Sequence, residues 1–530
     1  MNTREQLPNL YYYRPQPRLE RPPTIETDIC IYGGSCAGVT AAVAARRQAK
    51  TAALACFDSH VGGLSSGGLG ATDIGNKDAI GGISREFYKR LGAYYEQDES
   101  WTFEPHVAEQ IFRDMLAEAD VEVRHQQHLA KVHKEGTGIV AIEMTDGTIY
   151  RARAFIDATY EGDLLAMAGV SYHVGREGCD AYKETLNGIH FGDRNHDFRA
   201  WIDPYVQPGN PASGLLPLVQ DEPMGVQGRG DKCLQAYNFR MCLTDVASNR
   251  RPFPRPADYD PARFELLRRY IDAGCWEVMW LTIPMPNGKT DTNNSGAIGT
   301  DHIGANYSWP EGSYEEREAI FQDHVAYTAG LFYFLQNDVR LPDHVLDQMS
   351  QWGLPLDEFT ATGGFPHQLY IREARRMIGR HVTTEHDCRS QRVADDSIGL
   401  AAYTMDSHNC RRIVIDGRVV NEGNVEVPPY HPYPISYGSI VPKRNECTNL
   451  VVPVCLSASH IAYGSIRMEP VFMVLGQSAA TAAALAIDEA CDVQAVDYTA
   501  LRETLLRNGQ ILRWPPEVAA PRKRRETAGV

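Results

Sequence analysis

Two histidines lie in polar surroundings that suit proton transfer. His460 stands five residues before a predicted helix, Ser465–Ile487, and His408 lies in the run Asp406–Ser407–His408–Asn409. Histidine is favoured as a general base near neutral pH because its unperturbed pKa is about 6.5. A structural histidine that bonds a backbone carbonyl would give the same pattern, so both roles stay open for His460, with His408 as the second candidate. Tyr463 either binds a substrate hydroxyl or packs.

A glycine-rich run, Gly33–Gly34–Ser35–Cys36–Ala37–Gly38, follows an apolar stretch and precedes a helical pattern. Gly33 permits a tight turn, and Gly38 permits close packing of helix on strand. The N–H groups of such a turn and of the helix N-terminus hold a pyrophosphate. Ser35 replaces the middle glycine of G-x-G-x-x-G. A plain tight turn is the alternative, but the strand and helix on either side favour a dinucleotide site.

The acidic residue that usually accompanies such a turn is missing. It is expected about 20 residues further on, where it bonds a ribose hydroxyl, and that position is Cys56. Asp58 is the nearest carboxylate. It either serves from a longer turn or is an ordinary solvated turn residue.

A second small-residue run begins at His60 and ends at Gly70. Glycines and serines so close together suit a backbone that passes close to a flat ligand, although a flexible surface loop is the alternative. The predicted ligand contacts are His60, Gly62, Gly63, Leu64, Ser65, Gly67 and Gly68.

A third run, Ser457–Pro470, leads into a small-residue helix. A helix that begins here would direct its positive end at a ligand, which suits the negative charge of a reduced flavin. The predicted contacts are Arg467, Met468, Glu469, Pro470, Met473 and Gln477.

Other polar runs carry weaker expectations. Arg372, Arg375 and Arg376 are expected on a helix, where they bind a carboxylate substrate or, as we favour, form structural ion pairs. The spacing around Asp291–Asn294 and Asp301–His302 matches no metal loop, so no metal is predicted. The aromatic run Tyr430–Tyr437 stacks on sugar rings, lines a cofactor opening or packs in a Pro-rich loop, the reading we favour.

The elements that must position these residues follow a βαβ rhythm at the N-terminal end. From 172 to about 430 this rhythm is absent, which predicts a separate α+β domain with long loops. Asp146–Gly147 is a hairpin signal. The predicted strands are Thr27–Tyr32, Thr51–Phe57, Val121–Arg124, Ile139–Thr145, Thr148–Ala158 and Leu450–Leu456, and further predicted helices are Val107–Leu116 and Glu315–Leu335.

The totals exclude several classes of protein. The chain has 530 residues, 43% of them hydrophobic, which suits a large core, and no apolar run long enough to span a membrane. Its net charge of −16 disfavours nucleic acid as a partner. The twelve cysteines include no CxxC pair, so neither an iron–sulfur cluster nor structural zinc is indicated. The N-terminus lacks a signal-peptide pattern, and we expect a cytoplasmic protein.

The segments YGGSCAGVTAA, HVGGLSSGGLG, IDATYEGDL, QLYIREARRM and SASHIAYGSIRMEPVFMVLGQSAATAAALA together resemble a bacterial family of FAD-dependent oxidoreductases. The FAD domain of that family is similar to the flavoprotein subunits of succinate dehydrogenase and fumarate reductase, and to glutathione-reductase-like flavoproteins. The resemblance implies a non-covalently bound FAD, with the pyrophosphate at Gly33–Gly38 and the isoalloxazine near His60–Gly68 and Arg467–Gln477. Ala158, in IDATYEGDL, joins the predicted cofactor contacts.

The resulting prediction is an α/β fold, with a discontinuous Rossmann-like FAD-binding domain and an inserted α+β substrate domain. The predicted boundaries are an arm at 1–25, the FAD domain at 26–170 and 438–515, the inserted domain at 171–437 and a tail at 516–530.

The leading function is hydride transfer from a small organic substrate to flavin, at a CH–OH group of a sugar-like or polyol compound, with an unknown electron acceptor. One alternative is CH–CH or C–N redox chemistry on a carboxylate substrate bound by arginine. Another is a flavin-binding redox sensor or scaffold.

Overall fold

The computed structural model describes residues 7–192 and 195–515, so the predicted tail at 516–530 lies outside the described residues. A seven-stranded sheet forms the frame of the nucleotide-binding domain, in the order β3-β2-β1-β6-β5-β4, with β20 paired to β6. β1 runs parallel to β2 and β6, whereas β4 and β5 are antiparallel. The strands are β1 (Thr24–Tyr32), β2 (Ala52–Ala55), β3 (Glu122–Arg124), β4 (Leu129–Glu135), β5 (Gly138–Met144), β6 (Ile149–Asp157) and β20 (Leu450–Val451).

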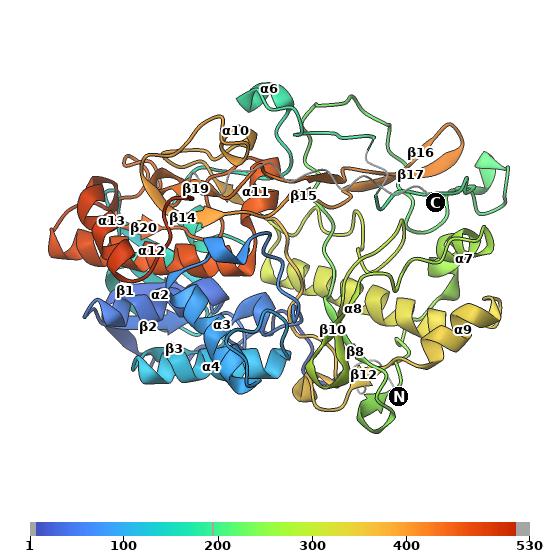
Figure 1. Ribbon diagram of the computed structural model, residues 1–530, viewed down its shortest axis with the longest axis horizontal. Coiled ribbons are helices and arrows are strands. Elements are labelled where there is room, and N and C mark those ends of the chain that lie inside the picture. Colours follow the sequence, from blue (N-terminus) through green and yellow to red (C-terminus); the bar gives the residue numbers. More distant parts are fainter. Residues whose placement is uncertain (1–6, 193–194, 516–530) are drawn as a thin grey trace.

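The two ends of the chain build this domain together. Figure 1 shows the N-terminal elements, in blue, beside the C-terminal elements, in red, while the middle of the chain, in green and yellow, forms the other half of the molecule. The predicted discontinuous Rossmann-like domain with an insertion is therefore confirmed, while its exact boundaries stay a prediction. Its helices are α2 (Cys36–Arg47), α3 (Gly82–Tyr94), α4 (Pro105–Glu118), α5 (Asp163–Met167), α11 (His460–Ile466), α12 (Glu469–Asp488) and α13 (Tyr498–Arg507).

Helix α12 is the packing partner of α2. Small residues let the two backbones approach: a Cβ on Gly476 would lie 2.2 Å from the carbonyl oxygen of Ala37. Among the described residues, α12 is also the helix long and apolar enough to cross a membrane, but 94% of that stretch is buried inside the protein. Core packing accounts for its apolar composition.

The predicted helix Ser465–Ile487 is two helices. The helical conformation is interrupted between α11 and α12, where Met468 is extended with φ −96° and ψ 136°. Pro470 stands in the first turn of α12, where its missing N–H costs no helical hydrogen bond. The predicted strand Leu450–Leu456 is shorter than expected and ends at Val451.

The inserted domain has its own sheet and core. Strand β11 (Lys289–Thr292) lies between β10 (Thr282–Met285) and β8 (Met241–Thr244), antiparallel to both. Helix α8 (Tyr314–Asn337) begins with a capping box formed by Ser313 and Glu316 and confirms the predicted long helix. The remaining helices are α6 (Cys179–Tyr182), α7 (Glu265–Asp272), α9 (Asp343–Ser350) and α10 (Glu385–Cys388).

Short antiparallel strand pairs add to these two sheets. They are β7 (Tyr172–His173) with β13 (Arg376–Met377), β9 (Arg250–Arg251) with β12 (Leu354–Pro355), β14 (Ser397–Ala401) with β19 (Tyr433–Ser436), β15 (Met405–Ser407) with β18 (Val425–Val427), and β16 (Arg411–Ile415) with β17 (Arg418–Glu422).

Candidate functional site

A cavity opens at the carboxyl ends of β1, β2 and β6. Ligands of doubly wound sheets bind at this edge, where the strand order reverses. The cavity is lined by Tyr11, Tyr12, Gly33, Gly34, Ser35, Phe57, Asp58, Gly63, Ala158, Thr159, Tyr160, Glu161, Phe321, His367, Gln368 and Leu369. Six of these, Gly33, Gly34, Ser35, Asp58, Gly63 and Ala158, are among the predicted cofactor contacts.

The glycine-rich turn has the geometry of a phosphate cradle. Gly33 has φ +112°, and a Cβ there would lie 2.6 Å from the carbonyl carbon of Ala158. A Cβ on Gly38 would lie 2.0 Å from the carbonyl oxygen of Gly33. Ser35 caps α2, accepting a hydrogen bond from Gly38 N at 3.3 Å and donating one to Ala158 O at 2.6 Å. The turn therefore fits a dinucleotide at the N-terminus of α2.

The second small-residue run folds into the tight turn Gly63–Ser65 beside the same cavity. A Cβ on Gly63 would lie 2.2 Å from the hydroxyl oxygen of Tyr160, and one on Gly67 would lie 2.2 Å from Cβ of Gln368. Both positions require glycine because a side chain there would collide with Tyr160 or Gln368. The segment is thus a buried, packed turn and not a flexible surface loop.

Cys56 occupies the expected place of the ribose carboxylate. It is fully buried, and its Sγ would lie 2.8 Å from a Cβ on Gly34. Asp58 lines the cavity and accepts a hydrogen bond from the backbone N of His60 at 2.7 Å. Burial raises the pKa of Asp58, against the opposing effect of His60.

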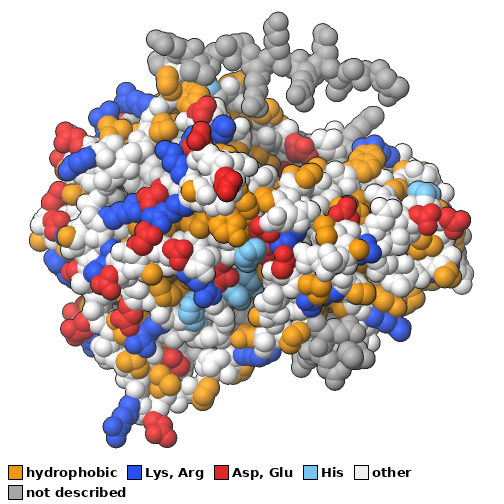
Figure 2. All heavy atoms as spheres, turned by 60° about the horizontal axis from the view of Figure 1, so that its bottom comes forward, with side chains coloured by type: hydrophobic (Ala, Val, Ile, Leu, Met, Phe, Trp, Pro, Cys, Tyr) orange, Lys and Arg blue, Asp and Glu red, His pale blue; other side chains and the backbone are white. Residues whose placement is uncertain are grey.

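One histidine, His367, lines the cavity, and a second, His60, stacks on it. His60 and His367 stack with their centroids 3.7 Å apart, and Nδ1 of His60 lies 3.1 Å from both carboxylate oxygens of Glu109. A group of histidine side chains is visible in the hollow at the middle of the face drawn in Figure 2.

Apart from Arg467, the predicted contacts at the start of α12 have three different surroundings. Glu469 lies behind the small-residue turn, where it accepts hydrogen bonds from Ser65 Oγ at 2.9 Å and Tyr160 OH at 2.8 Å. Gln477 lies further away, with Oε1 accepting from Ile83 N at 2.7 Å. Met468, Pro470 and Met473 are buried in the core.

A buried cluster of charges lies behind the glycine-rich segments. Nδ1 of His408 lies 2.6 Å from Asp301, whose other carboxylate oxygen lies 2.9 Å from Arg372. Nε2 of His408 lies 3.6 Å from Asp406, which accepts a hydrogen bond from Arg467 at 2.9 Å. These five residues come from four separate parts of the sequence, and β15 supplies the carboxylate of Asp406.

Tyr370 connects this cluster with the cofactor side. Its hydroxyl accepts a hydrogen bond from Arg467 at 2.7 Å, and the Arg372 guanidinium lies 4.6 Å from its ring centroid. The same ring packs with Leu64 and Leu69 of the second small-residue run. The charged cluster is therefore one side chain away from the segment that the resemblance assigns to the isoalloxazine.

Arg240 forms further buried ion pairs near this cluster. Arg240 makes two hydrogen bonds of 2.8 Å to Asp291 and one of 2.9 Å to Asp73. A Cβ on Gly68 would lie 2.6 Å from the carbonyl oxygen of Arg240. Asp291, which was expected in a polar loop, lies in β11.

Some donors of the cluster are left without partners. Within residues 7–192 and 195–515, Nε and Nη2 of Arg372 and Nε of Arg467 are buried and have no hydrogen-bond partner. Burying a charged group without partners is costly. These three N–H donors are therefore the candidates in the cluster for contact with an anionic ligand.

The pKa shifts follow from the charges. Burial and Arg372 lower the pKa of His408, but Asp301 and Asp406 outweigh them and raise it above its ordinary value. Burial raises the pKa of Asp301, but Arg372 and His408 overcome this and lower it. The two carboxylates thus favour the protonated form of His408, whose side chain is 11% exposed.

His460 and Tyr463 are enclosed by protein. Nδ1 of His460 lies 2.7 Å from Glu373, and Nε2 lies 3.0 Å from Ser407 Oγ. Burial, followed by Arg376, lowers the pKa of His460 to about 3. The Tyr463 hydroxyl donates to Val454 O at 3.2 Å. Both residues have the surroundings of structural side chains.

The segment that carries three of the arginines is not a helix, so that prediction is wrong. Arg376 lies in β13, which pairs with β7, and residues 371–375 have no helical structure. Buried carboxylates hold this segment in its irregular conformation: Arg375 lies 2.7 Å from Asp163, and Arg376 pairs with Glu177 at 2.7 Å. Arg375 and Arg376 therefore form structural ion pairs, as favoured from the sequence. Of the three arginines, Arg372 is the one that joins the cluster around His408 and has unused donors.

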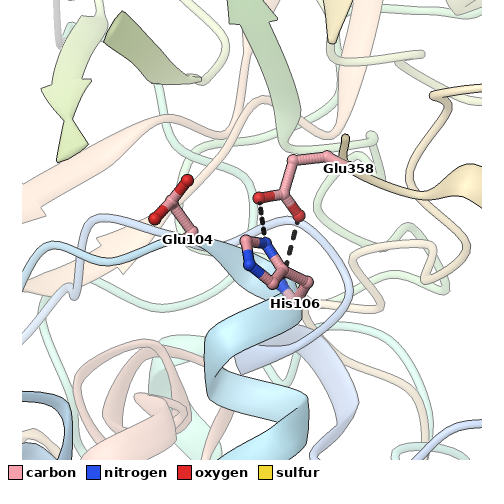
Figure 3. Close-up of side chains that lie close together, drawn as sticks. All are labelled: Glu104, His106 and Glu358. Atoms are coloured by element: carbon pink, nitrogen blue, oxygen red, sulfur yellow. Dashed lines mark hydrogen bonds and ion pairs between the residues drawn. The ribbon is translucent and has the colours of Figure 1, made fainter. Parts of the chain in front are cut away.

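Glu104, His106 and Glu358 form a group that could hold a metal ion. Figure 3 shows His106 directed at Glu358, with Glu104 to one side. The Lys289 ammonium, however, lies 2.6 Å from Glu104 and 2.8 Å from Glu358. Because this ammonium already neutralises the carboxylates, we interpret the group as an ion-pair network that links α4 with β11.

Comparison with known proteins assigns the pattern to a family. The family model described as FAD dependent oxidoreductase matches residues 28–505. No curated protein matches the chain.

Solved structures that match include 3-ketosteroid-delta4-(5alpha)-dehydrogenase from Rhodococcus jostii RHA1, at 12% identity over 28% of this chain and 50% of that one, with a TM-score of 0.20. L-proline dehydrogenase from P. horikoshii matches at 13% identity over 29% and 59%, with a TM-score of 0.24. Thioredoxin reductase from T. acidophilum matches at 22% identity over 30% and 40%, with a TM-score of 0.18. The chain thus spans about half the length of these structures.

Proposed function

The chain belongs to the family of FAD-dependent oxidoreductases and takes FAD as its cofactor, and from this premise we propose that it oxidises the CH–OH group of a substrate that carries a carboxylate. The observation that carries the proposal is the pair of unpartnered buried donors on Arg372, beside a histidine oriented by Asp301. A planar guanidinium with two free N–H groups suits a carboxylate.

The chain's residues divide the work between binding and proton transfer. Arg372 and Arg467 bind the carboxylate and fix the hydroxyl carbon beside Tyr370. His408, held by Asp301 through Nδ1, takes the hydroxyl proton at Nε2. As the C–O double bond forms, the C–H bond breaks and its electron pair leaves as hydride. Bound FAD supplies the acceptor for that hydride.

The second candidate is the alternative with CH–CH or C–N chemistry. The raised pKa of His408 favours it, because a protonated imidazole can donate a proton to a substrate that is being reduced. The same arginines would bind the carboxylate of that substrate.

Anaerobic mixing of the holoprotein with defined compounds separates the candidates. We expect 2-hydroxy acids and sugar acids to bleach the flavin, and the neutral polyols glycerol and sorbitol to leave it oxidised. Arg372→Met should abolish bleaching by the acids without releasing flavin. Bleaching by succinate or by an amino acid alone would favour the second candidate, and equal bleaching by sorbitol would contradict the role of Arg372.

A further inference from the structure

The N-terminal arm completes the wall of the dinucleotide cavity. Tyr11 and Tyr12 line it opposite the glycine-rich turn, together with Phe57 and Glu161. None of the sequence patterns that indicate a dinucleotide site includes the arm, because the arm precedes β1. Its side chains reach the cavity from the surface of the inserted domain.

The arm is fastened to that domain by specific contacts. Backbone N–H groups of Tyr12 and Tyr13 both donate to Glu318 of α8, at 2.7 and 2.9 Å. Gln322, one turn further along α8, donates to Leu10 O at 3.0 Å. The Leu10 side chain is buried in the core of the inserted domain. The arm thus spans from the inserted domain to the mouth of the cavity.

Tyr12 is the residue of the arm that meets the nucleotide-binding domain. Its ring centroid lies 4.6 Å from that of Phe57, which follows β2, and 4.6 Å from that of Trp309. Its hydroxyl donates to Glu161 at 3.1 Å. Glu161 is 8% exposed and lines the cavity.

The end of β2 is where a doubly wound dinucleotide site receives the adenosine. Cys56 supplies no carboxylate there, and its buried thiol leaves no room for a longer side chain beside Gly34. The groups that the cavity presents at this end are instead aromatic rings and the carboxylates of Asp58 and Glu161. Aromatic surface of this kind suits a purine ring.

We propose that Tyr11 and Tyr12 of the arm bind the adenosine end of FAD, with Tyr12 holding the wall of the cavity closed through Phe57 and Glu161. The arm thus supplies aromatic contacts at the end of the cavity where Cys56 offers no carboxylate, and FAD is released when the arm detaches from α8. This rests on the proposed function only in taking FAD as the cofactor, and it says nothing of the substrate.

The test measures FAD release from the full-length holoprotein, followed as the rise in flavin fluorescence after dilution. Tyr12→Ala should speed release about tenfold to a hundredfold, which corresponds to the loss of one or two aromatic contacts and a hydrogen bond. Tyr12→Phe keeps the ring and should speed it only a few-fold. Glu318→Gln, which weakens the anchor outside the cavity, should also speed release. Tyr94→Ala, at an exposed tyrosine of α3, is the matched control and should leave the rate unchanged.

Two further probes separate binding from folding. In the full-length chain freed of FAD, ADP should bind more weakly to Tyr12→Ala by the same factor as FAD, whereas FMN, which lacks the adenosine, should bind equally to both proteins. An unchanged FAD release rate in Tyr12→Ala, or an equal loss of FMN affinity, would overturn the inference. If that variant does not fold, unchanged release in both Tyr12→Phe and Glu318→Gln would overturn it. A wild-type protein that binds no FAD would instead contradict the family-based function.

Discussion

His408 and His460 differ in what their ring nitrogens meet. Both nitrogens of His460 are occupied by Glu373 and Ser407 inside the core. Those of His408 face Asp301 and Asp406, beside arginine donors that lack partners. Because His408 lies beside unpaired guanidinium donors and His460 does not, the base that we propose is His408.

Replacing His408 tests this choice. We expect His408→Gln to retain FAD and to slow flavin reduction by about two to four orders of magnitude. In the wild type, the reduction rate should rise with pH through a pKa above the ordinary histidine value, since Asp301 and Asp406 hold the proton on His408. That limb should vanish in the variant. Rapid-mixing spectrophotometry measures both effects.

His460→Gln is the comparison. It should lower the thermal midpoint and leave the pH profile of reduction in place. A fast reductive step with an unaltered pH profile in His408→Gln would remove that residue from proton transfer.

Glu161 provides a second prediction at this scale. Burial raises its pKa to about 7, although Arg317 opposes the shift. The folded chain therefore keeps a proton that the unfolded chain has lost between pH about 4.5 and about 7, and the free energy of unfolding falls across this range as pH rises. Glu161→Gln should flatten the fall in the thermal midpoint of the FAD-free protein over this window. A slope equal to that of the wild type would contradict the assignment.

Among the structural elements, the βαβ unit could be predicted from sequence because its signals are local. Gly33 and Gly38 stand in the turn between an apolar strand and a helix, and each has a steric reason to be glycine. The segment around Arg372 could not be predicted in this way. Its residues have the composition of a helix, but buried partners distant in sequence, such as Asp163 and Glu177, hold it in an irregular conformation.

The turn makes a sharp prediction. In Gly38→Val, the new Cβ would lie 2.0 Å from the carbonyl oxygen of Gly33, so the N-terminus of α2 must move away from β1. We expect a folded protein without FAD, measured as flavin absorbance per chain. Gly138→Val is a control of the same type, because Gly138 has no left-handed φ and the nearest atoms to a Cβ there would lie 3.7 Å away. Full flavin content in Gly38→Val would contradict the assigned cradle.

At the scale of the whole molecule, the charged cluster and the contacts between domains form only when distant parts of the chain come together in the folded protein. The cluster draws on Asp301 from the middle of the chain and on Arg467 from near its end. The sequence named His408 and Arg467 separately as candidates, but no local pattern brings Asp301 and Arg467 together. The contacts of Tyr12 could not be predicted either, because its partners Phe57, Glu161 and Glu318 are distant in sequence.

Lys289 links the nucleotide-binding domain with the inserted domain through buried ion pairs. Its fully buried ammonium joins Glu104, next to α4, with Glu358 of the inserted domain. Lys289→Met should leave these two carboxylates uncompensated and destabilise the protein by about 3–5 kcal/mol. Denaturant unfolding measures this. Lys50→Met, which breaks a pair with the exposed Asp488, should cost less than about 1 kcal/mol. Equal effects of the two substitutions would contradict the link.

The most direct test of the account is the anaerobic reduction of the bound flavin by a carboxylate-bearing alcohol, compared between wild type and Arg372→Met. The account predicts that 2-hydroxy acids or sugar acids bleach the flavin absorbance of the wild type in a single turnover. It predicts that Arg372→Met keeps its FAD and stays oxidised at the same concentrations. Bleaching of the variant at the wild-type rate, or a wild-type flavin that none of these acids reduces, would contradict it.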